Sequence, residues 1–155
     1  MPSIAIHYAS LDDLDVLATL FNDYRVFYRQ DPDLAGARHF LHERMRLRES
    51  VILLASDADS GEALGFVQLY PGFSSVAAMR IWILNDLFVS ANARRRGVAR
   101  ALLQGARDHA RATGVSRLIL ETNTDNQAAQ TLYESEGWER EDNLHYRLPV
   151  RCASS

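Results

Sequence analysis

The most informative part of this chain reads Leu87-Phe88-Val89-Ser90-Ala91-Asn92-Ala93-Arg94-Arg95-Arg96-Gly97-Val98-Ala99-Arg100-Ala101-Leu102-Leu103. Its first residues are apolar and predict a strand that ends near Val89, followed by a short polar loop. An amphipathic helix is predicted to begin around Gly97. The first N–H groups of a helix have no partner inside it and lie at the positive end of the helix dipole. This strand, loop and helix are therefore suited to binding a phosphate group.

The charge and size of the residues at this corner support a polyphosphate ligand. Three arginines, at 94–96, are followed by Arg100, while Gly97 and Ala99 are small enough for a ligand to approach the backbone. Two common nucleotide motifs do not fit. A P-loop requires a lysine, and the chain contains none. A dinucleotide fingerprint requires three glycines within an early β-α-β unit, whereas this stretch has one glycine in the middle of the chain.

Composition predicts an ordinary single domain over residues 1–155. A chain of 155 residues with 47% hydrophobic content can bury one core. The net charge of −3 argues against nucleic acid as the main partner, because duplex binding requires a broad basic face. The single cysteine, Cys152, cannot form an internal disulfide, and we expect an incidental reduced thiol. The sequence has no apolar run long enough to span a bilayer and no signal peptide, so we expect a cytoplasmic protein without a membrane partner.

Two patterns in the second half of the chain resemble the signatures of one family. The spacing Arg94-x-x-Gly97-x-Ala99 after an apolar strand resembles the acyl-CoA signature R/Q-x-x-G-x-G/A of the GNAT superfamily of N-acetyltransferases. Taken alone, this pattern also fits a plain strand, loop and helix with a cationic start.

The second signature agrees with the first. The chain matches N-x-x-A-x-x-x-Y-x-x-x-G-[WF] at Asn126, Ala129, Tyr133, Gly137 and Trp138. Both signatures occur in the family's order, separated by one helix and one strand. The resemblance therefore covers about the last half of the chain, and it is similar there to small histone- and polyamine-type acetyltransferases.

The resemblance implies an α/β fold in which a mixed sheet is covered by helices, in the order β-α-α-β-β-β-α-β-α-β-β. Hydrophobic periodicity is consistent with this order. Ser10 is predicted to cap the first helix, Asp33 lies where the second begins, and Gly114 ends the third. The strands are expected at 4–8, 51–55, 63–70, 80–89, 116–122, 138–142 and 144–149, and the two later helices at 97–113 and 126–136. The half that binds the cofactor is expected at about 80–149.

The resemblance implies acetyl-CoA as co-substrate and direct transfer to a primary amine in a ternary complex, with no covalent enzyme intermediate. A backbone N–H within 87–89, at Val89 by preference, is implied to polarise the thioester carbonyl. Asn126 is implied to bind the pantetheine or pyrophosphate region, to cap a helix, or to do both. The residues implied to bind the cofactor are Leu87, Phe88, Val89, Arg94, Arg95, Arg96, Gly97, Val98, Ala99, Arg100 and Asn126.

Two further residues are implied to be catalytic. Tyr133 is interpreted as the acid that protonates the leaving thiolate, and its alternative is an ordinary core residue of an amphipathic helix. Asp86 is interpreted as a group that orients water or binds a cationic acceptor, and a buried structural role is its alternative. Many relatives carry a glutamate where this chain has Asn85. The general base is therefore left open between Asp86, Glu121 and water.

The identity of the acceptor amine is the part of the function that the sequence specifies least. Acidic composition and Asp86 favour a small cationic molecule over a protein lysine or N-terminus. A different class of function is a non-catalytic CoA-binding regulatory or interaction module with the same fold. The five histidines have no ligand spacing, so no metal is expected. A homodimer is compatible with the sequence.

Overall fold

The computed structural model describes residues 3–151, which fall into one unit that extends to Asn123 and another that begins at Thr124. Cys152 lies outside the described residues. The elements of the first unit are β1 (Ile4–Tyr8), α1 (Leu14–Phe27), α2 (Leu34–Arg46), β2 (Val51–Asp57), β3 (Ala63–Ser74), β4 (Met79–Val89), α3 (Val98–Ala112) and β5 (Leu118–Ile119). Short 3₁₀ turns precede α1 at Leu11–Asp13 and α3 at Ala91–Ala93.

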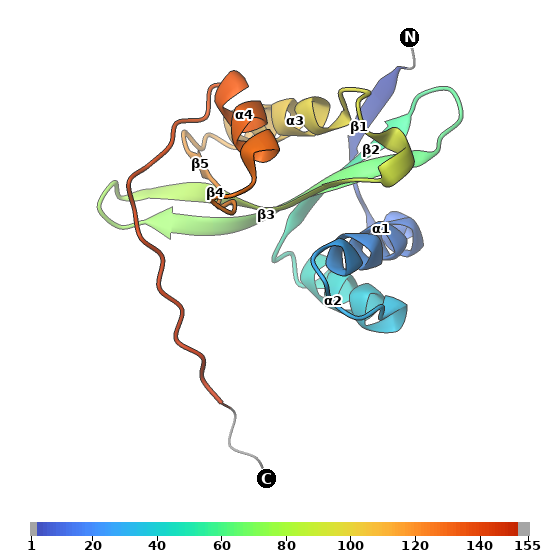
Figure 1. Ribbon diagram of the computed structural model, residues 1–155, viewed down its shortest axis with the longest axis horizontal. Coiled ribbons are helices and arrows are strands. Elements are labelled where there is room, and N and C mark those ends of the chain that lie inside the picture. The colour runs from blue at the N-terminus through green and yellow to red at the C-terminus, as the bar shows by residue number, and fades with distance from the viewer. Residues whose placement is uncertain (1–2, 152–155) are drawn as a thin grey trace. The chain divides into compact units, whose positions relative to one another are not determined.

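The strands of the first unit form one mixed sheet in the order β1-β2-β3-β4-β5 (Figure 1). Neighbouring strands are antiparallel except β4 and β5, which run parallel. This arrangement confirms the predicted α/β class. It also confirms the order of elements as far as the fourth helix.

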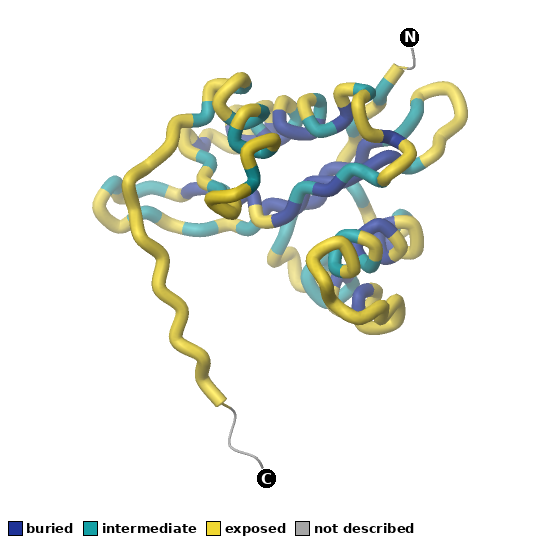
Figure 2. The backbone as a smooth tube through the Cα atoms, in the orientation of Figure 1, coloured by how far each residue is buried: buried dark blue, intermediate teal, exposed yellow. Residues whose placement is uncertain are grey.

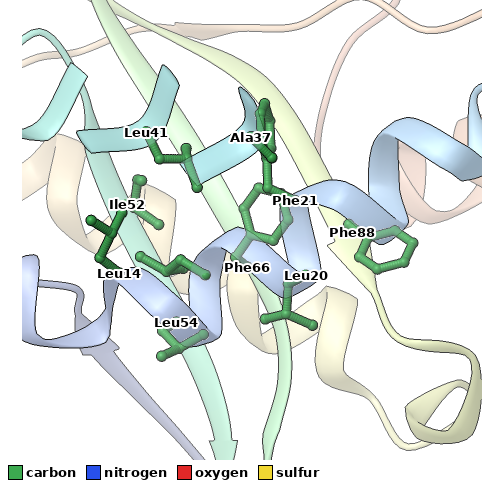
Figure 3. Packing of buried hydrophobic residues seen from close by; sticks show 10 residues of the cluster. Leu14, Leu20, Phe21, Ala37, Leu41, Ile52, Leu54, Phe66 and Phe88 are labelled. Atoms are coloured by element: carbon green, nitrogen blue, oxygen red, sulfur yellow. The ribbon is translucent and has the colours of Figure 1, made fainter. Parts of the chain in front are cut away.

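Helices cover both faces of the sheet because its strands are apolar on both sides. On one face, Phe66 and Phe88 join side chains of α1 and α2 in a buried cluster (Figure 3). On the other face lies α3, whose Leu102 and Ala106 are fully buried. In Figure 2, buried residues recur along α1 and α3 between exposed ones, as expected for helices that pack one side against a sheet. The middle strands of the sheet are therefore buried between two layers of helices.

Local capping explains where the helices begin and end. The Ser10 hydroxyl accepts from the Asp12 N–H, while the Asp13 carboxylate accepts from the Ser10 N–H, so this end of the first helical segment is closed. Asp33 accepts from the Gly36 N–H at 2.9 Å and begins α2. Gly114 follows α3 with φ of +71°, a left-handed conformation that glycine adopts without strain. The predicted starts and stops at Ser10, Asp33 and Gly114 are confirmed.

The hairpin of β3 and β4 is longer than predicted. The sequence predicts a strand that ends at residue 70, but β3 continues to Ser74. Pro71 pairs with Trp82 of β4. The pairing of β2 with β3 ends at Leu69, so beyond this residue β3 has an open edge on the β2 side. Proline has no backbone N–H, and at this open edge no ladder hydrogen bond requires one.

The prediction for the last strands was wrong. The strand expected at 116–122 is reduced to Leu118–Ile119, and the described residues at 138–142 and 144–149 contain no strand. Leu144 and Tyr146 alternate with polar residues as in a half-buried strand, yet they are 81% and 90% exposed. An alternating segment is stable as a strand only when a partner strand and an apolar surface are available to it. The sequence pattern alone supplies neither.

A histidine on α3 makes the stability of the first unit depend on pH. His109 is buried, with the Tyr8 hydroxyl 2.6 Å from its Nδ1 and the Trp82 ring centroid 4.8 Å from its own. Its Nε2 has no hydrogen-bond partner among the described residues. Burial lowers the pKa of His109 below its ordinary value of 6.5, because a charged ring loses its hydration.

We therefore expect the free energy of unfolding to fall as the pH drops below about 6.5. As the pH falls, the His109 ring takes up a proton in the unfolded chain at a higher pH than in the folded chain. The stabilisation of the folded state is therefore complete above about pH 6.5 and is lost as the pH falls toward the lower pKa of the folded state. His109 contributes at most about 1.4 kcal/mol per pH unit to the slope of the unfolding free energy against pH. Urea denaturation at pH 7.5 and pH 5.0 should show a weaker pH dependence in His109→Gln. His39→Gln, at an exposed position of α2, should keep the wild-type dependence. An unchanged dependence in His109→Gln would contradict the assignment.

Candidate functional site

A β-bulge in β4 sets the position of Asp86, the most buried carboxylate of the sheet. Gln68 pairs with Asp86, but the next residue of β3, Leu69, pairs with Leu84, so Asn85 is an extra residue in β4. Asp86 is only 6% exposed. The Gln68 side-chain amide donates to its Oδ2 at 2.8 Å, and the Asn85 amide donates to its Oδ1 at 3.1 Å. Both oxygens of the carboxylate are therefore held in a fixed orientation.

Beyond this bulge, the backbone of β4 has one open edge. The Ser90 N–H donates to the Leu64 carbonyl at 2.9 Å, on the β3 side. Backbone groups alternate sides along a strand, so the N–H groups of Leu87 and Val89 point to the opposite edge. On that edge β5 pairs with β4 no further than Ile83, and no other strand of the described residues takes its place. The predicted position of backbone N–H donors, within 87–89, therefore coincides with an open edge.

The loop after β4 leads to a helix start that no side chain caps. Arg95 and Gly97 both have positive φ, at 65° and 80°. The Ala101 N–H bonds to the Gly97 carbonyl, which leaves the N–H groups of residues 98–100 without partners inside the helix. A Cβ built on Gly97 would meet no atom within 4 Å, so the backbone is approachable from outside. N–H groups without partners at an approachable helix start are the kind of donors that bind an anion.

The three consecutive arginines have three different environments. Arg96 forms an ion pair with Asp57 at 2.8 Å, and both side chains are largely shielded from solvent. The guanidinium of Arg94 lies over the Phe27 ring, 5.3 Å from its centroid. Arg95 is exposed, and within residues 3–151 its side chain makes no ion pair. Adjacent residues in the sequence therefore do not form one uniform cationic cluster.

The partner of Arg96 remains charged over the physiological range. Backbone N–H groups of Ser60 and Asp59 donate to the Asp57 carboxylate at 3.0 and 2.9 Å. The Ser60 N–H contributes most, with Arg96 next, to lowering the pKa of Asp57 to about 2. The ion pair is therefore present at any pH at which the protein would be expected to work.

Sequence reasoning missed one residue beside Asp86. Gln68 is fully buried in β3, where its neighbours are apolar, and a polar residue at that position was the available signal. Tyr70 lies on the same face of β3, because side chains two residues apart share a face. Burial, and then the negative charge of Asp86, raise the pKa of Tyr70 to about 12, so this phenol stays neutral.

The remaining predicted residues lie on the second unit, whose helix is α4 (Gln127–Ser135). Asn126 accepts from the Ala129 N–H at 3.1 Å, so its interpretation as a helix cap is confirmed. Tyr133 lies on α4, half-buried, with its ring centroid 6.0 Å from that of Trp138. Asn126 and Tyr133 are seven positions apart, which is about two helical turns, so they lie on the same side of α4.

Neither a metal centre nor a membrane span is found in the part of the chain that the structure describes. No three His, Cys, Asp or Glu side chains between residues 3 and 151 come together as metal ligands. Within the same residues, no helix has the length and apolar character needed to cross a bilayer.

Comparison with known proteins agrees with the geometry. Residues 15–138 match the family model described as Acetyltransferase (GNAT) family. An uncharacterized N-acetyltransferase, YhfO, from Bacillus subtilis is 48% identical over 146 residues, which is 94% of this chain and 97% of the relative. A probable acetyltransferase from Haemophilus influenzae is 36% identical over 81% of this chain and 84% of its own. The crystal structure of a probable acetyltransferase superposes with a TM-score of 0.88, at 45% identity, over 96% of this chain and 99% of that one.

Fold, site geometry and sequence similarity thus agree on an acetyl-group transferase. The chain belongs to the GNAT family, and it is an acetyl-CoA-dependent N-acetyltransferase. The family resemblance carried by the two signatures is confirmed.

The open backbone at Gly97 leads to a testable expectation about binding. Gly97→Ala forces a side chain into a left-handed conformation and adds a methyl group where phosphates would approach. We expect a loss of about 1 kcal/mol in unfolding free energy and a roughly tenfold weaker CoA affinity in calorimetry. Gly114→Ala, at φ of +71° and beyond the other end of α3, is the matched control and should lose stability alone. Equal CoA affinity in the two variants would show that phosphates do not approach Gly97.

Proposed function

We propose that this enzyme transfers the acetyl group directly to the primary amine of a small cationic molecule, in a ternary complex and within a single functional domain. The observation that carries the proposal is the end of β4. Backbone N–H groups at its open edge lie within a few residues of a buried, oriented carboxylate and of an uncapped helix start. Donors for an acyl oxygen, a negative charge for an ammonium group and donors for phosphates are thus present on one strand and the loop that follows it.

The start of α3 and the loop before it would hold the phosphates of CoA. The N–H groups of residues 98–100 provide fixed positive dipoles, and Arg95 adds an exposed positive charge. These donors fit an anion without rearrangement of the helix. Asn126, which already caps α4, is proposed to contribute as a ligand through its amide.

The N–H of Val89 is proposed to polarise the thioester carbonyl, with Leu87 as the other donor on that edge. A backbone donor that is already in place is effective because it does not need to reorganise when negative charge develops on the oxygen. Phe88 lies between them and packs its side chain in the core, which holds the strand backbone that carries both donors.

Asp86 is proposed to bind the ammonium form of the acceptor or to position the water that removes its proton. An alkylammonium is mostly charged at pH 7, so the amine must lose a proton before it can attack. Gln68 and Asn85 fix the carboxylate, and the chain has no glutamate at position 85 to act as a direct base. Tyr70 is excluded as the base, because its raised pKa keeps it protonated. We propose that water carries the proton away.

The acceptor class is tested by titrating the purified protein with acetyl-CoA and then measuring release of the CoA thiol against a panel of amines. We expect micromolar binding and release stimulated by polyamines or amino sugars more than by lysine peptides or peptide N-termini. Asp86→Asn should raise KM for a cationic amine by about tenfold, because the charge that attracts it is lost. Binding without amine-dependent release would instead favour the non-catalytic CoA-binding module.

Tyr133 is proposed to protonate the leaving thiolate. Tyr133→Phe should lower kcat by about 10² while Kd for acetyl-CoA stays the same, because general acid catalysis contributes at least that much and the ring is retained. Tyr146→Phe, which removes a hydroxyl from a 90% exposed residue, is the control and should keep wild-type kinetics. Unchanged kcat in Tyr133→Phe across the pH range would exclude this role.

A further inference from the structure

The loop between β4 and α3 is attached to the turn between β2 and β3. We name residues 90–97 the phosphate loop and Asp57–Glu62 the acidic turn. Arg96 of the phosphate loop forms an ion pair with Asp57 at 2.8 Å. At the other end of the loop, the Asn92 amide donates to Glu62 at 3.2 Å. Two contacts, one of them a charged pair, therefore join residues that are 30 and 39 positions apart in the sequence.

The acidic turn is itself well ordered, which makes it a suitable anchor. The Asp57 N–H donates to the Glu62 carbonyl at 2.8 Å, and the Gly61 N–H donates to the Asp57 carbonyl at 2.8 Å. The Asp57 carboxylate also accepts from the Asp59 and Ser60 N–H groups. A side chain fixed by two backbone donors holds its partner in one place.

The conformation of the phosphate loop shows why it needs an anchor. Arg96 lies between Arg95 and Gly97, which both adopt positive φ. A non-glycine residue in that region is strained, and it persists only when its surroundings hold it there. The ion pair with Asp57 fixes Arg96, the residue that follows Arg95. The guanidinium of Arg96 is also turned toward Asp57 and is shielded from solvent by it.

We propose that Asp57 is a positioning residue for CoA binding. It acts through Arg96, holding the phosphate loop so that the first N–H groups of α3 and the side chain of Arg95 face the phosphates. Arg96 then serves as a tether, and Arg95 serves as the phosphate-binding cation of the three. This inference rests on the proposed function, because it assumes that the loop binds the phosphates of CoA.

The ion pair gives the proposal a test in which the two alternatives predict opposite results. If Arg96 is a tether, Asp57→Asn releases the loop and weakens CoA binding. If Arg96 binds phosphate itself, Asp57→Asn frees a positive charge and leaves binding equal or stronger. The asparagine keeps an oxygen that can accept from the turn N–H groups, so the acidic turn is preserved.

The experiment is a double-mutant cycle on CoA affinity, measured by calorimetry on the full chain with Asp57→Asn, Arg96→Ala and the double variant. We expect each single variant to raise Kd by about tenfold and the double variant to raise it no further, because one interaction is removed in all three. Arg96→Lys, which keeps one charged donor, should recover part of the affinity. Asp59→Asn, an exposed carboxylate of the same turn, is the matched control and should bind CoA as the wild type does.

Steady-state kinetics separate positioning from a general loss of structure. KM for acetyl-CoA should rise in Asp57→Asn, while kcat at saturating acetyl-CoA and KM for the amine stay within twofold of wild type. Wild-type CoA affinity in Asp57→Asn together with a loss in Arg96→Ala would overturn the proposal, and so would additive losses in the double variant. Failure of the wild-type protein to bind CoA would instead refute the proposed function.

Discussion

One extra residue in β4 determines what the end of this strand can do. Before the bulge, the Trp82 N–H donates toward the β5 side, to the Arg117 carbonyl at 3.2 Å. In an uninterrupted strand, the N–H groups of the even-numbered residues would continue to face that edge. Asn85 shifts the alternation by one, so Leu87 and Val89 present their N–H groups there instead.

The same shift moves side chains between the faces of the sheet. Trp82 packs against His109 on the α3 side, whereas Phe88 packs in the cluster of α1 and α2. Without the bulge, these two even-numbered residues would lie on one face. Asp86 is likewise brought to the α1 and α2 side, where Gln68 lies opposite it. The core aromatic, the buried carboxylate and the backbone donors thus depend on a single irregularity, and the burial of Phe88 fixes it in place.

Local signals predicted the parts of the fold whose causes are local. The helix start at Gly97, the caps at Ser10 and Asp33, and the stop at Gly114 are set by a few neighbouring atoms, so the sequence was sufficient for them. No local signal predicts the bulge, because residues 81–84 are all apolar and give no alternation that would show which face each side chain takes. The ion pair of Arg96 with Asp57 joins residues 39 apart, and no local pattern indicates it. The last strands were mispredicted for a related reason. Alternation of apolar and polar residues is a property of one segment, and it does not indicate whether a partner strand is available to that segment.

The different environments of the three arginines are consistent with the proposal that this loop binds phosphate. Backbone N–H groups at a helix start bind an anion only when they point toward it. Their contribution to affinity therefore depends on how accurately the loop before the helix is held. An additional mobile cation strengthens attraction at long range but does not improve that geometry, and salt screens it. A tether that uses one cation to order the loop therefore contributes more than the same cation left in solvent. The Asp57 carboxylate makes this possible because the backbone of its own turn already fixes it, so pairing with Arg96 requires ordering of only one long side chain.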